Sequence, residues 1–287
     1  MQRQTTAWLT LCLMGAVTFS SAQNGSSFQS PQVKLVWETK AVLKTPESVL
    51  YDETDSVLFV SNINGDPLQH DKNGFISMMS PDGEMLKLNW ATGLDAPKGM
   101  GISQGKLYVA DIDMLVEISI QDGKVLSKYP AAGAKFLNDV TVDEDGVVYI
   151  TDMQTNRIYS FKDGKLDVWL EDESLDKPNG ILAEHGRLLV GTRNNILLIR
   201  LDSKEIKVQF YDTGGIDGLV SAGRGNYLTT DWAGLTQQVN LLEGIQKLID
   251  TTPDKINAAD LEFIQSKRLM LIPTFNDNRV RAYTLEQ

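Results

Sequence analysis

The 287-residue sequence contains one cysteine and two histidines, too few for several common kinds of site. A single cysteine excludes a disulfide framework and a thiolate cluster for zinc or iron–sulfur, and two histidines exclude a histidine-rich metal centre. Basic residues are also scarce, with 27 Lys and Arg against 38 Asp and Glu. The net charge of -11 opposes binding to nucleic acid or to an anionic membrane surface. Any chemistry must therefore depend mostly on oxygen ligands.

The first 22 residues have the pattern of a signal peptide. Arg3 precedes an apolar stretch over residues 7–19, and the small residues Ser20-Ser21-Ala22 follow it. The stretch is too short to cross a bilayer, and the small residues suit cleavage after Ala22. We expect a signal peptide over residues 1–22, a disordered lead-in over 23–32 and one folded domain over 33–287. We also expect export to the periplasm or secretion, with no membrane span.

The rest of the sequence repeats about every forty residues, apart from an insertion at residues 64–73 that lengthens the first repeat. Each repeat begins with a short anchor motif, and apolar segments separated by turns follow. Turns such as Asp122-Gly123 and Asp163-Gly164 between these segments indicate β-hairpins. Four short antiparallel strands in a repeat of this length are typical of a propeller blade. The six repeats predict an all-β, six-bladed β-propeller, with residues 241–249 as the one stretch that could also be helical.

The two ends of the chain indicate how the ring closes. Residues 33–39 resemble residues 166–171, which form the fourth strand of a repeat. The last repeat ends with a third strand over residues 279–285 and has nothing after it. We therefore predict that the N-terminal strand completes the sixth blade, which removes an open sheet edge.

The anchor motifs predict a site at one mouth of the central tunnel. In a blade whose first strand is innermost, the loop that enters strand one and the loop between strands two and three open on the same face. The second residues of the six motifs are Glu47, Lys98, Asn138, Asn179, Asp217 and Ala259. Four of them carry side-chain oxygens suited to Ca²⁺. Asn-Gly and Asp-Gly pairs are individually common in turns, but four oxygen-bearing anchors in phase favour a cation site.

The ends of the second strands form another polar series on the same face: Asn62, Asp111, Asp152, Thr192, Asp231 and Thr274. We assign these mostly to blade architecture, as acceptors of backbone hydrogen bonds. Trp232 could pack on a ligand at the mouth, although core packing is an alternative. The insertion, which carries His70, could act as a lid. We expect His185 to lie in a turn on the opposite face with a structural role.

The anchors Pro46-Glu47, Leu137-Asn138-Asp139, Pro178-Asn179-Gly180 and Ile216-Asp217-Gly218 resemble those of the family of gluconolactonase, senescence marker protein (regucalcin) and luciferin-regenerating enzyme. The resemblance covers about residues 33–285. It implies a six-bladed propeller with one divalent metal, most often Ca²⁺, with Mn²⁺, Mg²⁺ and Zn²⁺ as alternatives. It also implies that Glu47, Asn179 and Asp217 are metal ligands, that Asp217 doubles as general base, and that Asn138 contacts substrate or metal-bound water.

One position departs from this family. Sugar-lactone hydrolases of the family carry an arginine two residues before the asparagine that matches Asn138, and here the residue is Phe136. We count Lys98 and Phe136 with Asn138 as substrate-binding candidates. Phe136 removes a bidentate polar clamp, which favours a more apolar ester or lactone. The sequence thus predicts a metal-dependent hydrolase of a lactone or related small-molecule ester. The alternative is a non-catalytic binding propeller, since the loops are also similar to those of NHL-type and strictosidine-synthase-like propellers.

Overall fold

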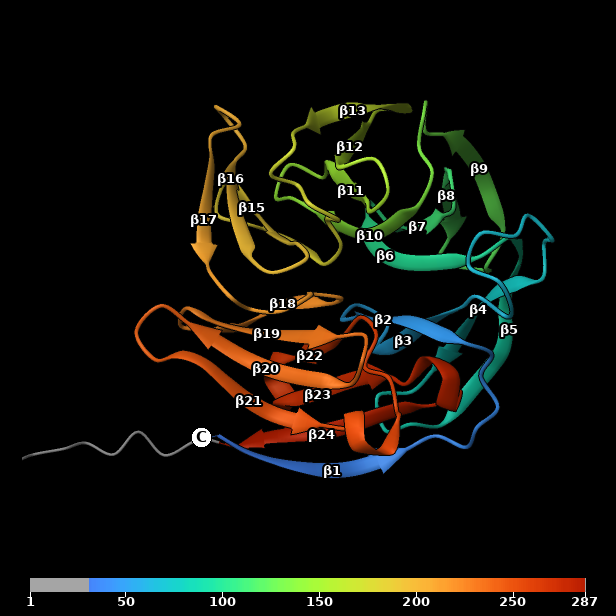
Figure 1. The fold of residues 1–287 in the computed structure, drawn as a ribbon. Helices are drawn as coiled ribbons and strands as arrows, with labels where there is room; N and C mark the ends of the chain where they lie inside the picture. Colours follow the sequence, from blue (N-terminus) through green and yellow to red (C-terminus); the bar gives the residue numbers. More distant parts are fainter. Residues whose placement is uncertain (1–30, 287) are drawn as a thin grey trace, which may run out of the picture.

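The computed structural model describes residues 31–286, which form six four-stranded antiparallel sheets arranged in a ring (Figure 1). The predicted all-β, six-bladed propeller is therefore confirmed. The predicted signal peptide lies outside the described residues, as does all but the end of the lead-in. In residues 31–286 the only helices are three short 3₁₀ turns, η1 (Thr252–Asp254), η2 (Gln265–Lys267) and η3 (Phe275–Asp277). No helix in that range is long and apolar enough to cross a membrane.

The first five blades each use four consecutive strands, ordered from the tunnel outward as the sequence predicts. Their bounds are β2 (Pro46–Asp52), β3 (Val57–Asn62), β4 (Gly74–Met79) and β5 (Met85–Leu94) in blade 1; β6 (Pro97–Ser103), β7 (Lys106–Asp111), β8 (Met114–Ser119) and β9 (Val125–Pro130) in blade 2; β10 (Leu137–Val142), β11 (Val148–Asp152), β12 (Arg157–Lys162) and β13 (Lys165–Glu171) in blade 3; β14 (Ile181–Glu184), β15 (Arg187–Gly191), β16 (Ile196–Arg200) and β17 (Ile206–Phe210) in blade 4; β18 (Leu219–Gly223), β19 (Asn226–Asp231), β20 (Leu235–Asn240) and β21 (Gly244–Asp250) in blade 5. Most of the ambiguous stretch at 241–249 is strand β21.

Blade 6 joins the two ends of the described chain. It consists of β22 (Glu262–Ile264), β23 (Leu269–Pro273), β24 (Val280–Glu286) and the N-terminal strand β1 (Gln32–Glu38). β1 pairs antiparallel with β24, from Gln32 opposite Glu286 to Glu38 opposite Arg281. Just beyond the strand, the hydroxyl of Thr39 accepts a hydrogen bond of 3.1 Å from the backbone N–H of Val280. The predicted closure of the ring by the N-terminal strand is thus confirmed.

The hydrophobic core is divided into layers between neighbouring blades. One cluster joins blades 1 and 2 through buried residues such as Phe59 and Val116, and another joins blades 6 and 1 through residues such as Leu58 and Leu271. Equivalent clusters occupy the other four junctions. Strands that are buried on both faces in this way have nearly continuous apolar sequences, such as residues 188–190 in β15. Each blade is therefore stabilised by packing against both of its neighbours.

Glycines let the inner strands approach one another around the tunnel. A Cβ on Gly180 would lie 2.7 Å from the carbonyl oxygen of Asp217, and a Cβ on Gly218 would lie 2.5 Å from the backbone nitrogen of Leu261. Neither glycine has a positive φ, so neither serves a left-handed turn. The glycine that follows each of these anchor residues is required by close packing between blades.

Candidate functional site

The six predicted site residues line a single cavity of about 330 Å³ at one mouth of the tunnel. Their side chains are brought together from five of the six anchor motifs, which lie between residues 47 and 217 of the sequence. The lining consists of the predicted residues Glu47, Lys98, Phe136, Asn138, Asn179 and Asp217 together with Ile63, Pro67, Met153, Trp232 and Phe275. The structure therefore supports the predicted convergence, while the chemical role of each residue stays a prediction.

The polar residues of the cavity sit where the innermost strands begin. Glu47, Lys98 and Asn138 occupy the second positions of β2, β6 and β10, and in each strand the pairing register shifts at that point. Such an irregularity re-aims side chains away from the regular alternation of a strand. Asn179 and Asp217 lie just before β14 and β18. A shared start-of-strand geometry in five blades thus directs five polar side chains into one cavity.

Two carboxylates in the cavity are buried and incompletely paired. Glu47 is 5% exposed and Asp217 is 7% exposed. Oε2 of Glu47 and Oδ2 of Asp217 have no hydrogen-bond partner, whereas Oδ1 of Asp217 accepts a 2.5 Å hydrogen bond from the side-chain nitrogen of Asn179. Unsatisfied buried oxygens are rare in folded proteins and call for an explanation such as an ion or a water.

Burial makes these carboxylates weak acids in the absence of a cation. Desolvation, followed by the negative charge of Asp217, raises the pKa of Glu47 well above its usual range, and the positive charge of Lys98 opposes the shift. Desolvation also raises the pKa of Asp217 to about 7, although the hydrogen bond from Asn179 opposes it. A divalent cation beside both groups would favour their ionised forms.

Lys98 is the single cationic side chain in the cavity lining. It is 1% exposed, and its Nζ donates hydrogen bonds to the carbonyl oxygens of Ala96 at 2.8 Å and Pro67 at 3.1 Å. The ammonium lies 4.7 Å from the centre of the Phe136 ring. Burial lowers the pKa of Lys98 to about 8, against the attraction of Glu47. One lysine does not balance two ionised carboxylates, so ionisation of both Glu47 and Asp217 calls for further positive charge in the cavity.

The donor set fits a hard divalent cation. Glu47 and Asp217 each provide a free carboxylate oxygen, and Asn179 adds a neutral amide, a combination that suits Ca²⁺. Residues 31–286 contain no cluster of three or more His, Cys, Asp or Glu side chains placed to hold a metal. A cation held here would therefore take two charged ligands from the chain and the rest from neutral oxygens.

The hollow between the inner strands is lined by two more carboxylates that the sequence analysis missed, Asp139, which is buried, and Asp260, which is partly buried. Desolvation raises the pKa of Asp139 to about 7 and that of Asp260 well above its usual range. Both are fully hydrogen-bonded: Asp139 accepts from the backbone of Val140 and Ile181, and Asp260 accepts from its own neighbour Leu261 and from the hydroxyl of Ser48. Each acid directly follows an anchor residue in the sequence, which is the signal that could have found it.

The apolar residues of the cavity also follow a regular signal. Ile63, Met153, Trp232 and Phe275 each come immediately after a member of the polar series at the ends of the second strands. That series itself has the predicted architectural role. Asn62 accepts a backbone hydrogen bond from Lys44, Asp111 accepts from Asp95 and Ala96, and Asp152 accepts from Lys135 and Phe136. Each of these three side chains fixes the loop that enters the first strand of its own blade.

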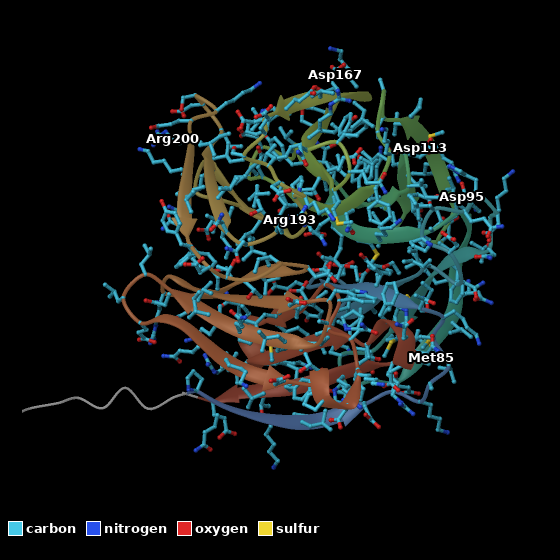
Figure 2. All side chains as sticks on the ribbon, in the orientation of Figure 1. Met85, Asp95, Asp113, Asp167, Arg193 and Arg200 are labelled. Atoms are coloured by element: carbon cyan, nitrogen blue, oxygen red, sulfur yellow. The ribbon has the colours of Figure 1, made fainter. Side chains whose placement is uncertain are left out.

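The insertion between β3 and β4 reaches the cavity through Pro67. It is held by Asp95, whose carboxylate accepts a hydrogen bond of 2.9 Å from the backbone of Lys72 and lies 3.2 Å from Nδ1 of His70. Asp95 lies at the side of the ring that carries the insertion (Figure 2). His70 thus anchors the loop and does not line the cavity.

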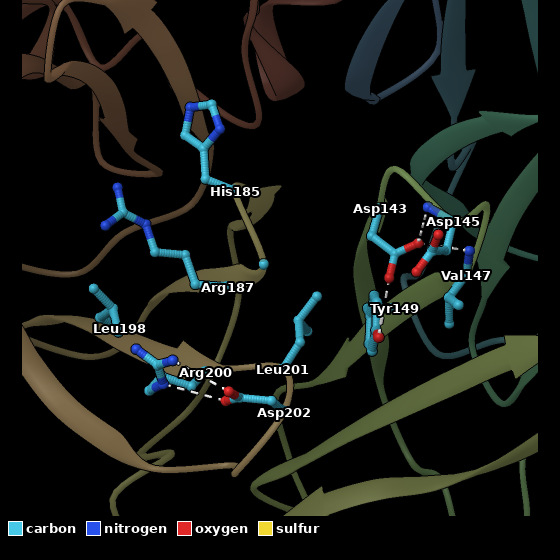
Figure 3. Close-up of a pocket in the computed structure, with 11 residues that line it drawn as sticks. Asp143, Asp145, Val147, Tyr149, His185, Arg187, Leu198, Arg200, Leu201 and Asp202 are labelled. Atoms are coloured by element: carbon cyan, nitrogen blue, oxygen red, sulfur yellow. Dashed lines mark hydrogen bonds and ion pairs between the residues drawn. The ribbon is translucent and has the colours of Figure 1, made fainter.

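A larger groove of about 610 Å³ lies on the opposite face, between blades 3 and 4 (Figure 3). His185 lines it from the β14–β15 turn, as predicted for that face. The charged groups in the groove pair among themselves or with close neighbours: Arg200 with Asp202, Arg187 with Glu184, and Asp143 with backbone N–H groups and Tyr149. Its size therefore does not make it the better candidate, because no buried carboxylate oxygen in its lining lacks a partner, although Nε of Arg187 does.

No protein-family model matches the sequence, and a search of curated proteins finds no match. Solved structures do match across most of the chain. They include a streptogramin B lyase (TM-score 0.65, 13% identity, covering 89% of this chain and 98% of that one). They also include a virginiamycin B lyase from Staphylococcus aureus (TM-score 0.62, 15%, 88% and 100%) and a gluconolactonase from Xanthomonas campestris (TM-score 0.64, 15%, 89% and 90%). At these identities the likeness shows the propeller fold alone.

Proposed function

We propose that this propeller is a metal-dependent hydrolase of a lactone or related ester, with the 330 Å³ cavity as its active site. The observation that carries the proposal is the pair of buried, unpartnered oxygens, Oε2 of Glu47 and Oδ2 of Asp217, on two residues that line the same cavity. The gluconolactonase among the structural neighbours lends support, because it places lactone hydrolysis on a similar fold. One fold hosts many functions, so the proposal depends on the residues of the site.

Glu47, Asn179 and Asp217 would hold the cation, with Ca²⁺ favoured by the oxygen donors and Mn²⁺, Mg²⁺ or Zn²⁺ as alternatives. The bound cation would polarise the substrate carbonyl and stabilise the negative charge that develops on its oxygen. It would also keep Glu47 and Asp217 ionised at neutral pH, against the effect of burial.

Residues of the chain then transfer the proton and bind the substrate. Asp217 accepts a proton from water as the water oxygen bonds to the carbonyl carbon. The acyl C–O bond breaks, and the proton returns from Asp217 to the leaving alkoxide, so that a lactone yields a hydroxy acid. Asn138, which is 4% exposed in the cavity lining, is positioned to hydrogen-bond the substrate or the water. Export through the predicted signal peptide at residues 1–22 is part of the same proposal.

Metal content and turnover test the proposal together. The purified protein is analysed for bound metal and then assayed on lactones and aryl esters with Ca²⁺, Mn²⁺, Mg²⁺ or Zn²⁺ added after treatment with a chelator. We expect turnover that requires a divalent cation and falls by about 10²-fold or more in Asp217→Asn, the range for loss of a positioned acid–base group. Asp163→Asn, an exposed position in the β12–β13 turn, is the matched control and should keep full activity.

Two results would contradict the hydrolase. Turnover that is unchanged in Asp217→Asn would remove the proposed base. Cation binding that raises the melting temperature without consumption of any substrate would instead indicate a propeller that only binds a ligand.

A further inference from the structure

The cavity has a polar floor and an apolar wall. The floor is formed by the starts of the inner strands, where Glu47 and Asp217 are almost fully buried. The wall is formed by residues that enter strand one or follow strand two, and its members are Ile63, Pro67, Phe136, Met153, Trp232 and Phe275. Ligand pockets of about 300–1,000 Å³ commonly combine a few polar groups for the reacting end with an apolar lining for the body of the ligand. This cavity lies at the small end of that range.

The wall offers few hydrogen bonds to a ligand. An ammonium has three N–H donors, and Lys98 uses two of them on the carbonyl oxygens of Ala96 and Pro67. Its nitrogen lies over the ring of Phe136, so at most one N–H of Lys98 is left for a ligand. Asn138, whose side-chain nitrogen is 4.0 Å from the sulfur of Met153, is the one amide in the lining apart from Asn179, which donates to Asp217. A ligand with several hydroxyl groups would lose its hydrogen bonds to water here and regain few of them.

The aromatic residues are held in place around the cavity. The backbone N–H of Phe136 donates to Oδ1 of the buried Asp152 at 3.2 Å, which fixes the loop that carries the ring. Trp232 and Phe275 pack edge to face, with ring centres 5.5 Å apart and planes at 78°. The backbone of Phe275 has a φ of +48°, a strained conformation for a bulky residue and one that tends to occur at functional sites.

Trp232 remains 48% exposed although it lines the cavity. A large aromatic side chain left open at the rim of a concave site is a surface that an apolar ligand can cover. Trp232 and Met153 also line a neighbouring hollow of about 270 Å³ that contains Arg193, which lies near the centre of the ring in Figure 2. A ligand larger than the cavity therefore has a direction in which to extend.

From these observations we propose that the site takes a lactone or ester whose body is aromatic or aliphatic and that it discriminates against polyhydroxylated sugar lactones. The proposal rests on the hydrolase function proposed above. In it, the carbonyl end meets the polar floor, and the body of the substrate packs against Phe136, Trp232 and Phe275. Phe136 and Trp232 are then specificity-determining residues, because they contact the part of the substrate that does not react.

Binding of lactams, which mimic lactones but resist hydrolysis, tests this preference without turnover. Calorimetry compares dihydroquinolinone, a bicyclic aryl lactam, with a polyhydroxylated sugar lactam, in the presence and absence of Ca²⁺. We expect the aryl lactam to bind at least about tenfold more tightly. Phe136→Ala and Trp232→Ala should each weaken its binding about tenfold, the usual effect of truncating an aromatic contact. Tyr211→Ala removes an aromatic side chain that is 66% exposed and outside the cavity lining, so this variant should bind the aryl lactam as tightly as the unaltered protein.

Folding of each variant is checked by its thermal melting curve, and Phe136→Leu, which keeps an apolar side chain of similar size, replaces Phe136→Ala if that variant unfolds. Equal or tighter binding of the sugar lactam would overturn the proposal, as would aryl lactam binding that is insensitive to both Phe136 and Trp232. If the aryl lactam binds as expected while no lactone or ester is hydrolysed, the proposed preference for apolar ligands is supported and the proposed hydrolase function is wrong. If only sugar lactones are hydrolysed, the proposed hydrolase function is supported and the proposed preference for apolar ligands is wrong.

Discussion

The side-chain amide of Asn179 donates a 2.5 Å hydrogen bond to Oδ1 of Asp217, across the junction between blades 4 and 5. The bond orients Asp217 and leaves its Oδ2 buried without a partner. Asn179 is itself held, because its carbonyl oxygen accepts a 3.0 Å hydrogen bond from the hydroxyl of Thr151 in blade 3. Three consecutive blades thus fix one carboxylate oxygen in the cavity.

The raised pKa of Asp217 predicts how the metal-free protein responds to pH. Its folded-state pKa of about 7 exceeds the ordinary value of about 3.9 for an unfolded chain. Between these values the folded state binds more protons than the unfolded state, so the stabilisation is complete below about pH 4 and is lost as the pH rises through 7. We expect the free energy of unfolding, measured with urea and a chelator, to fall by up to about 1.4 kcal/mol per pH unit from this group.

The variant Asp217→Asn should show a shallower decline over the same pH window, because its amide does not titrate, whereas Asp163→Asn should behave as the unaltered protein. Added Ca²⁺ should restore stability most at the high-pH end, where protons no longer compete for the carboxylates. A decline of equal slope in both variants would show that Asp217 is not the responsible group.

Replacement of Lys98 by methionine should tighten cation binding. The ammonium of Lys98 lies in the same lining as Glu47 and Asp217 and repels a cation placed there. We expect Lys98→Met to bind Ca²⁺ up to about tenfold more tightly by calorimetry, which corresponds to about 1.4 kcal/mol. Lys165→Met, on an exposed hairpin away from the cavity, is the control. Weaker binding in Lys98→Met would mean that the lysine supports the site through its hydrogen bonds to Pro67 and Ala96.

The close approach of the inner strands predicts a sharp difference between two glycines. Gly180→Ala would place a Cβ 2.7 Å from the carbonyl oxygen of Asp217, whereas Gly215→Ala would have its nearest contact at 3.7 Å. Overpacking of this kind destabilises by about 1–3 kcal/mol, so Gly180→Ala should lower the melting temperature and Gly215→Ala should change it little. Equal melting temperatures for the two variants would contradict the packing assigned to the tunnel.

Removal of the N-terminal strand should lower stability severely. Deleting residues 31–40 exposes the edge of β24 and uncovers the cluster against which Trp37 packs. We expect a large drop in the denaturant midpoint and a tendency to aggregate through the open edge. A chain lacking residues 23–30 serves as the control. Comparable midpoints for the two deletions would show that β1 contributes little to the ring.

The fold could be predicted from the sequence because one pattern repeats six times. The phase of the anchor motifs set the number of blades, and the likeness of residues 33–39 to residues 166–171 indicated the closing strand. The last part of the fifth repeat was harder to interpret. The apolar residues at 241–249 resemble a helix locally, and only their pairing with β20 makes most of them a strand.

Only part of the candidate site could be predicted from the sequence. The equivalent positions of Glu47 and Asp217 in their repeats indicated that both side chains face one mouth of the tunnel. Four residues of the apolar wall follow the ends of the second strands, but local conformations such as the positive φ of Phe275 decide how such side chains enter the cavity. The tunnel acids Asp139 and Asp260 were passed over because each stands one place after an anchor. The glycines after Asn179 and Asp217 suggested turns, whereas the structure uses them for contact between distant parts of the chain.

The pairing of β1 with β24 constrains the order in which the molecule is made. The hydroxyl of Thr284 and the carbonyl oxygen of Lys34, 3.5 Å apart, are separated by 250 residues of sequence. During synthesis β1 has no partner until β24 has been added, and contacts of such long range form slowly. Blades 1 to 5 use consecutive strands and can assemble as they emerge, but blade 6 needs both β1 and β24. Any interruption of synthesis before residue 280 therefore leaves an incomplete ring with exposed edges, so the ring can close only after residues 280–286 have been made.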